Sequence, residues 1–244
     1  MRRVVTILMM TILGLSVSCW GQGRVTRPVM EKQANVKNQS KSAHTKKKRV
    51  RQNKATRHLA NGYEYVDLAL PSRLKWATTN LGASSPEGKG AYFAWGDTMR
   101  RQSYTYCLTS SKDINDLKAE GFITDSQTLA QSQDAASFYR SDGWRIPTSQ
   151  EFQELIDHCK WEWVESDTSS GYKIIGKNGN SIFLPASGYY LGSKLVNEGE
   201  GGHYWTATAY EDNFSAYGLS FSNGSFILSW YNRCFGRVIR PVIK

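Results

Sequence analysis

The chain has 244 residues and a formal net charge of +10, from 31 Lys and Arg against 21 Asp and Glu. Residues 1–58 hold 14 of the basic residues and one acidic residue, so residues 59–244 hold 17 basic and 20 acidic residues, a net charge of −3. All 13 Tyr, all 9 Phe and 7 of the 8 Trp also follow residue 58. The basic charge therefore belongs to a tail, which argues against a globular domain that binds nucleic acid. The remainder is long enough to bury one full core.

The N-terminus has the pattern of an export signal. Arg2 and Arg3 precede an apolar run from Val4 to Val17, which is shorter than the roughly 20 residues of a membrane span. We therefore predict a signal peptide over residues 1–21 and a mature chain without a transmembrane span. Cleavage after Gly21 and lipidation of Cys19 at a degraded lipobox both remain open. The expected location is extracytoplasmic: the periplasm, outer membrane or cell surface of a Gram-negative bacterium, with or without a lipid anchor.

Residues 22–60 are basic and contain no aromatic residue. Such a segment cannot bury enough surface to offset its ordering entropy, so we predict a disordered linker. It could tether the domain to an anionic envelope surface through its charge, or act only as a solvated spacer.

The first part of the domain, which we expect over residues 61–244, shows short strand patterns. Residues 63–68 alternate in polarity, and residues 74–78 resume the pattern after a break at Pro71. Residues 91–96 indicate a short aromatic strand or a tight turn. Residues 97–125 are polar and without periodicity, which predicts a long surface insertion.

Helical patterns follow. Residues 129–139 are compatible with a helix. Thr148 and Glu151 form a capping box, and the apolar residues after it recur on one helical face. We predict a helix over residues 149–159 whose apolar stripe, Phe152, Leu155, Ile156 and Cys159, packs on the core.

The last third of the chain is strand-like. Asn178-Gly179 and Asn223-Gly224 each separate two strand patterns, which predicts two hairpins with type I′ turns. Residues 238–243 form a terminal strand pattern. Helices early and strands late predict an α+β class.

One segment, Gly143-Trp144-Arg145-Ile146-Pro147-Thr148 followed by Glu151-Phe152, resembles the Trp-Arg-(Leu/Met)-Pro-Thr-x-x-Glu-(Trp/Phe) motif of the Fibrobacter succinogenes major paralogous domain. The formylglycine-generating sulfatase-modifying family carries a distantly similar segment. Further pieces with the same order as in the first family extend over the whole domain: residues 61–68, 74–78, 92–97, 178–186, 204–206 and 236–242.

The resemblance implies a C-type-lectin-like fold with two helices early, antiparallel hairpins late, and first and last strands that pair. The sequence departs from the family at Thr79, where members often have a Cys that a residue at the position of Cys159 could partner. Residues 97–125 are also longer than the family leads us to expect.

Three cysteines remain after the signal peptide: Cys107, Cys159 and Cys234. In an oxidising compartment this odd number leaves open one disulfide with one free thiol, or three buried thiols. Cys159 lies on the apolar helix face, where a buried structural role is favoured. The sulfatase-modifying relatives use two thiols to bind copper, and only Cys234 lies in the corresponding late region, so an oxidase is disfavoured.

Other catalytic and cofactor patterns are weak. His158 at a predicted helix end and His203 in a predicted loop are the only histidines after residue 58, and no H-E-x-x-H or G-x-S-x-G occurs. Residues 171–178 imitate a phosphate loop but lack its Ser/Thr and its helix. No cofactor is expected. Calcium binding is possible but unsupported, because the calcium-binding motifs of sugar-binding C-type lectins are absent. The available oxygen donors are scattered in loops: Glu198, Glu200, Glu211, Asp212 and Asn213.

Aromatic residues remain as binding candidates. Tyr189, Tyr190, Trp205 and Tyr210 could stack on a ligand, although a core role is the competing interpretation for each. We interpret Trp144, Arg145, Pro147, Thr148 and Glu151 as a structural motif, and expect Arg145, Arg237 and Arg240 to satisfy internal acceptors.

Together these patterns predict an exported, envelope-associated, non-catalytic module that binds a glycan or a surface protein. A structural surface or pilus-like component is the first alternative, and an oxidase of the formylglycine-generating type is the second.

Overall fold

The computed structural model describes residues 58–141 and 143–244. The expected signal peptide, Cys19 and residues 22–57 of the expected linker lie outside the described residues. Residues 58–60 were assigned to the linker, but they form a strand that pairs with residues 63–65. The ordered domain therefore includes His58, whose ring stacks on Tyr65 with centroids 5.5 Å apart.

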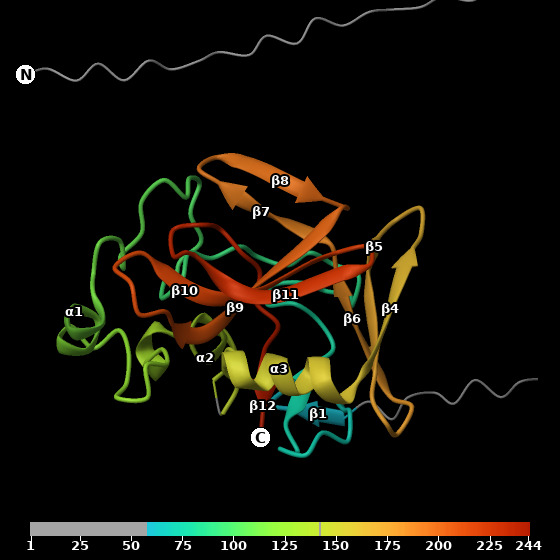
Figure 1. The fold of residues 1–244 in the computed structure, drawn as a ribbon. Coiled ribbons are helices and arrows are strands. Elements are labelled where there is room, and N and C mark those ends of the chain that lie inside the picture. The colour runs from blue at the N-terminus through green and yellow to red at the C-terminus, as the bar shows by residue number, and fades with distance from the viewer. Residues whose placement is uncertain (1–57, 142) are drawn as a thin grey trace, which may run out of the picture. The chain divides into compact units, whose positions relative to one another are not determined.

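Three sheets dominate the fold (Figure 1), and all their strand pairs are antiparallel except β7 with β9 in the third sheet, which is parallel. The first sheet has the order β1-β2-β3-β12 and consists of His58–Ala60, Tyr63–Asp67, Lys75–Ala77 and Val242–Ile243. The second has the order β4-β5-β6 and consists of Lys160–Glu165, Ser170–Ile175 and Ser181–Pro185. The third has the order β11-β10-β9-β7-β8 and consists of Ser225–Asn232, Ser215–Ser222, Gly201–Ala209, Ser187–Leu191 and Lys194–Glu198.

Helices are few and short: α1 (Ile114–Ala119), the 3₁₀ turn η1 (Gln131–Gln133), α2 (Ala135–Arg140) and α3 (Ser149–His158). The predicted helix over 149–159 is thus confirmed almost to its ends. Its capping box is present, since the Thr148 hydroxyl accepts from the Glu151 N–H and the Glu151 carboxylate accepts from the Thr148 N–H. The segment predicted as a helix over 129–139 divides into η1 and α2, and α1 was not predicted. The α+β class is confirmed, with strands predominating.

The expected direct pairing of the first and last strands is wrong. β12 pairs with β3 through Val242 and Trp76, and β3 in turn pairs with β2. The strand β3 therefore lies between the two ends of the domain, although both ends share one sheet.

Both predicted hairpins are present as β5–β6 and β10–β11. Their turns are not type I′, which requires positive φ at both central residues. Only Gly179 (φ 82°) and Gly224 (φ 79°) have positive φ, while the preceding asparagines do not.

The segment 97–125 is more than the surface insertion that its polarity predicted. Tyr104, Leu117, Phe122 and Ile123 are all buried. Leu117, Phe122 and Ile123 join a core cluster that also contains Trp95, Trp205 and Ile239. The segment therefore supplies one wall of this second core, and its polar residues Asp97 and Thr109 are buried as well.

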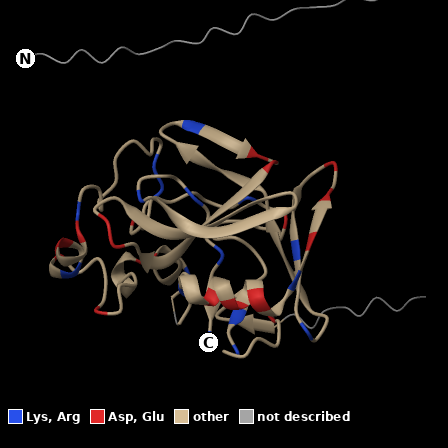
Figure 2. Cartoon of the chain, viewed as in Figure 1, with Lys and Arg blue, Asp and Glu red and all other residues tan. Residues whose placement is uncertain are grey.

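The other core cluster lies between α3 and the sheets. Phe152 and Leu155 of α3 belong to the same cluster as Trp76, Ile174, Leu184 and Leu219. All six side chains are fully buried. Figure 1 shows α3 covering one face of the β9–β10–β11 region, with the β7–β8 hairpin on the other side. Figure 2 shows acidic and basic positions interspersed over the described domain. Within it, no helix has the length and apolar character needed to cross a membrane.

Candidate functional site: an aromatic shelf

The four aromatic residues predicted to bind a ligand do not form one face. Trp205 is 1 % exposed and its indole N–H donates to the Phe93 carbonyl at 2.9 Å, so it is a core residue. Tyr190 contacts the rings of Tyr92 and Tyr104 with centroids 4.9 and 5.4 Å away. Tyr189 contacts His203 at 4.7 Å. Only Tyr210 belongs to an aromatic group with a largely exposed member.

That group, which we call the aromatic shelf, consists of Tyr210, Tyr217 and Trp230. Tyr210 stacks on Trp230 with ring centroids 5.5 Å apart and planes 26° apart, and meets Tyr217 edge-on at 5.4 Å. Trp230 is 52 % exposed, while the two tyrosines are half-buried. Tyr217 and Trp230 are directly opposite each other on β10 and β11, so side chains of one sheet face build the shelf.

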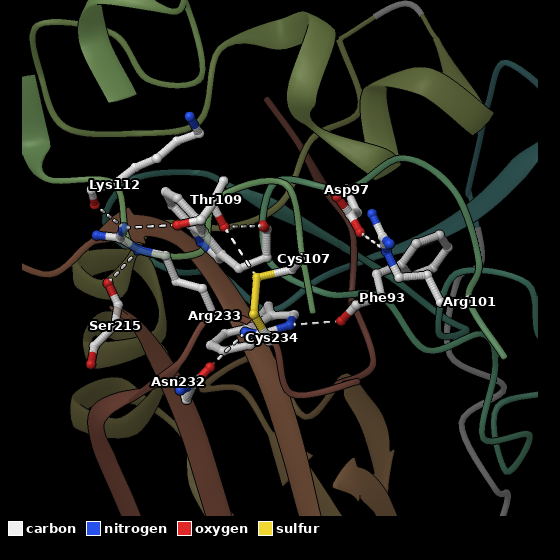
Figure 3. The surroundings of a disulfide bond; sticks show 12 residues. Phe93, Asp97, Arg101, Cys107, Thr109, Lys112, Ser215, Asn232, Arg233 and Cys234 are labelled. Carbon is white, nitrogen blue, oxygen red and sulfur yellow. Dashed lines mark hydrogen bonds and ion pairs between the residues drawn. A yellow bond between two sulfur atoms is a disulfide. The ribbon is translucent and has the colours of Figure 1, made fainter. Parts of the chain in front are cut away.

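Arg233 fixes the loop that carries Tyr210. This residue is fully buried and donates only to main-chain carbonyls (Figure 3). Its Nη2 donates to Asp212 at 2.9 Å and Tyr210 at 3.3 Å, and its Nε donates to Ser215 at 2.8 Å. Its Nη1 donates to Lys112 at 2.7 Å. Sequence reasoning missed this residue, because its acceptors come from two distant loops.

Asp212 closes the same loop from within. Its carboxylate accepts from the N–H of Phe214 at 2.8 Å and from the hydroxyl of Ser215 at 2.7 Å. Burial acts to raise the pKa of Asp212, but these hydrogen bonds outweigh it and hold the pKa below its ordinary value. Asp212, one of the loop residues considered as calcium ligands, thus already accepts hydrogen bonds from its own loop.

A disulfide between Cys107 and Cys234 lies next to Arg233 (Figure 3). It joins the segment 97–125 to the end of β11, the strand of Trp230. Cys159 is the free thiol, half-buried at the end of α3. This settles the open alternatives as one disulfide and one thiol. Burial raises the pKa of Cys159 to about 11, so a thiolate is disfavoured there.

His203 lies on the opposite face of the sheet from α3. It is in β9 rather than in a loop, and it lines a cleft of about 290 Å³ together with Asn197, Glu200 and Ser220. Its Nδ1 is 3.0 Å from the Ser220 hydroxyl, to which Arg237 donates at 3.3 Å. Burial, and secondarily the charge of Arg237, lower the pKa of His203 to about 3.

This Ser–His contact lacks the features of a nucleophilic pair. A general base works best when its pKa is near the ambient pH, and a histidine with a pKa of about 3 is too weak a base. The buried Nε2 has no hydrogen-bond partner in the described structure, so no acid orients the ring. The chemistry available at this cleft is hydrogen bonding to a ligand.

The residues of the motif around Trp144 make internal contacts. Trp144 is buried and donates to the Ala60 carbonyl at 3.3 Å. Arg145 holds Glu151 in a two-point ion pair, with Nη1 and Oε2 2.7 Å apart. Pro147 accepts from the Ala207 N–H at 2.8 Å. Arg145 also exchanges main-chain bonds with Val242, so the motif joins α3 to the last strand.

Metal donors are dispersed over the part of the chain that the structure describes, where no three or more His, Cys, Asp and Glu side chains gather into a metal-binding group. A cleft of about 400 Å³ is lined by Val66, Val164 and Phe183, among others. Its two charged residues, Glu87 and Lys173, are both exposed. Neither observation supplies a cofactor site.

Comparison with known proteins gives one partial match, to a family model without an assigned function. Residues 157–242 match the family described as a domain of unknown function (DUF8237). This match runs from the end of α3 to β12 and includes the aromatic shelf. Searches of curated proteins and of solved structures found no match.

Proposed function

We propose that this chain is a non-catalytic binding module that holds a glycan against the aromatic shelf. The observation that carries the proposal is the stacked pair Tyr210 and Trp230, whose outer ring is 52 % exposed. The C–H face of a sugar ring packs well on an indole, and the polar groups of Tyr and Trp remain available for hydrogen bonds. The exposed side chains of Glu211 and Asn213 lie in the same loop and could accept from sugar hydroxyls.

Rigidity of the shelf supports binding. Arg233 and Asp212 anchor both ends of the loop 210–215, so little conformational entropy remains to be lost when a ligand settles on Tyr210. The disulfide at Cys234 anchors the end of the strand that carries Trp230.

The weak basicity of His203 and the disfavoured Cys159 thiolate support a non-catalytic role. Cys234, the only late-region thiol, is in a disulfide, so the two-thiol copper site of the sulfatase-modifying relatives has no pair of free thiols among the described residues.

The wider setting follows from the sequence patterns. We place the domain in the C-type-lectin-like fold of the Fibrobacter succinogenes major paralogous domain family, exported by the signal peptide over residues 1–21. Its basic linker would keep it near an anionic envelope surface, where glycans and surface proteins are its available partners. Lipidation of Cys19 would anchor it there.

A glycan array probed with the purified protein tests the proposal, once with calcium and once with chelator. We expect binding that is insensitive to chelator, because the shelf uses rings rather than an ion. Trp230→Ala should weaken binding by about tenfold or more, since stacked aromatic residues contribute much of such contacts. Ile227→Ala is the matched control, because Ile227 is 57 % exposed on the same strand but on its other face.

Two outcomes contradict this function. Glycan binding that survives in Trp230→Ala places the ligand elsewhere, and binding that requires calcium would assign it to the acidic loops around Glu198 and Glu211 instead.

A structural surface component is the second candidate, and the edge strand β11 favours it. β11 pairs only with β10, and its register turns the main-chain groups of Phe226, Leu228 and Trp230 toward the free edge. No main-chain hydrogen bond reaches these three from the described residues. An uncharged edge of this kind can add a strand from another chain. Concentration-dependent oligomers that Leu228→Pro abolishes would favour assembly over glycan binding.

A further inference from the structure

Arg140, the last residue of α2, is buried without a carboxylate partner in the described structure. It is 4 % exposed, and none of the ion pairs of the described residues includes it. Its Nη2 donates to the Thr79 hydroxyl at 3.1 Å, while Nε and Nη1 have no acceptor. Burying N–H donors of a charged group without acceptors is costly, and such groups normally find partners.

Two aromatic rings hold the guanidinium in place. Its central carbon is 4.5 Å from the centroid of the Tyr63 ring and 5.0 Å from that of Trp144. These rings stabilise the cation through their faces but accept none of its in-plane N–H groups. The orientation of Arg140 is therefore fixed before any ligand arrives, while its Nε and Nη1 donors remain unused.

Arg140 lines an open pocket of about 330 Å³. We call it the arginine pocket; the lining residues that matter here are Tyr63, Thr79, Ser84, Arg100, Tyr139 and Arg140. Its described lining contains two arginines and no acidic residue. The ring of Tyr139 is 40 % exposed and supplies an apolar wall. The buried ring of Phe93 supports it from behind, with centroids 6.0 Å apart.

Gly82 keeps the second arginine close to the pocket. A Cβ at this position would come within 2.9 Å of Arg100 Nη2, and the backbone there has φ +80°. Glycine is the residue that tolerates both the conformation and the close approach. The exposed Arg100 can therefore lie over the loop 82–84 beside the pocket.

We propose that the arginine pocket binds the carboxylate of a small cyclic acid, with the guanidinium of Arg140 as the anchor and the ring of the ligand against the exposed ring of Tyr139. A carboxylate supplies the acceptors that the buried donors lack, and a charge-assisted hydrogen bond is the strongest available interaction for them. The volume lies at the lower end of small-molecule pockets, which fits one ring with one acidic group. The pocket shares no residue with the aromatic shelf, so this inference stands independently of glycan binding.

The test is an NMR titration of the full ¹⁵N-labelled chain that follows the Arg140 Nε–H resonance. Benzoate and glucuronate are the probes, representing an aromatic acid and a sugar acid, and benzamide and glucose are their neutral counterparts. We expect at least one acid to shift this resonance and to saturate with a dissociation constant of about 1 mM, as for a small ligand with one charged contact. The neutral counterpart should bind at least about tenfold more weakly, because it lacks the charge.

Variants separate the pocket from general charge. Arg100→Gln should weaken acid binding by roughly threefold to tenfold, as expected for loss of one nearby exposed charge. Arg73→Gln removes an exposed arginine outside the pocket and should leave binding unchanged. Arg140→Gln also removes the contacts of the guanidinium with Tyr63 and Trp144. If that variant does not fold, the comparison of Arg100→Gln with Arg73→Gln decides the test.

Three results would overturn the proposal. They are an Arg140 Nε–H resonance that no acid moves, neutral counterparts that bind as well as the acids, and binding of inorganic phosphate without binding of either carboxylate.

Discussion

Arg240 and Asn80 are joined by a hydrogen bond of 2.9 Å from the guanidinium Nε to the side-chain oxygen, across 160 positions of sequence. The same guanidinium donates to the carbonyls of Ala77, Thr78 and Phe183 at 3.0, 3.1 and 2.7 Å. Arg240 is fully buried. A single side chain thus ties the β3 end, the following loop and β6 to the C-terminal segment.

Arg240→Leu should therefore destabilise the protein by about 3 kcal/mol or more. The substitution leaves several buried carbonyls without donors, and each such group costs about 1–3 kcal/mol when no water replaces the donor. Urea unfolding followed by tryptophan fluorescence measures the change. Arg73→Leu, at an exposed site, should change the free energy of unfolding by less than about 0.5 kcal/mol. Equal effects of the two substitutions would contradict the role given to Arg240.

The disulfide between Cys107 and Cys234 spans 127 positions. Closing so long a loop restricts the unfolded chain, and replacing both cysteines by serine should cost about 2–5 kcal/mol. The expected result is a lower urea midpoint, together with faster proteolysis within 97–113. Cys159→Ser is the control, since this thiol is free and only half-buried. A double variant as stable as the wild type would show that packing alone holds the segment.

How much of this could be read from the sequence depends on how local each feature is. The Thr148 and Glu151 box and both hairpins use residues within a few positions of one another, and all three were predicted. The turn type was wrong because positive φ at Asn178 and Asn223 is an option rather than a requirement of those residues.

Arg233 and Arg140 show the opposite case. Arg233 acquires its role from carbonyls of residues 109–112 and 210–215, and Arg140 from Tyr63, Thr79 and Trp144. No spacing in the sequence indicates such contacts. The burial of Trp205 was equally hidden, because β9 is covered on both faces along most of its length and so lacks the alternation that separates core from surface.

Protonation of His203 should make stability depend on pH. Burial and Arg237 lower its folded-state pKa to about 3, against an ordinary value of 6.5. Between these values the unfolded state binds a proton that the folded state does not, so stability falls as the pH drops below 6.5. At pH 5 the loss from this residue should be about 2 kcal/mol relative to pH 7.

His203→Gln keeps a polar partner for Ser220 without a titrating ring. Between pH 7 and pH 5, the free energy of unfolding of this variant should fall by about 2 kcal/mol less than that of the wild type. His158→Gln, at the end of α3, is the matched variant that removes the other histidine of α3–β12. Parallel pH profiles for the wild type and His203→Gln would show that the ring is protonated in the folded state.

Two glycines near one hairpin should respond very differently to alanine. A Cβ at Gly176 would meet the main-chain oxygen of Leu68 far inside van der Waals contact, and this oxygen cannot move without displacing the end of β2. A Cβ at Gly179, in contrast, meets nothing within 4 Å, although φ there is +82°. Gly176→Ala should thus cost about 3 kcal/mol or more through strain in the core, and Gly179→Ala only about 1 kcal/mol through its positive φ. Thermal unfolding of the two variants measures both. If the order were reversed, β5 and the end of β2 would not be in contact at Gly176.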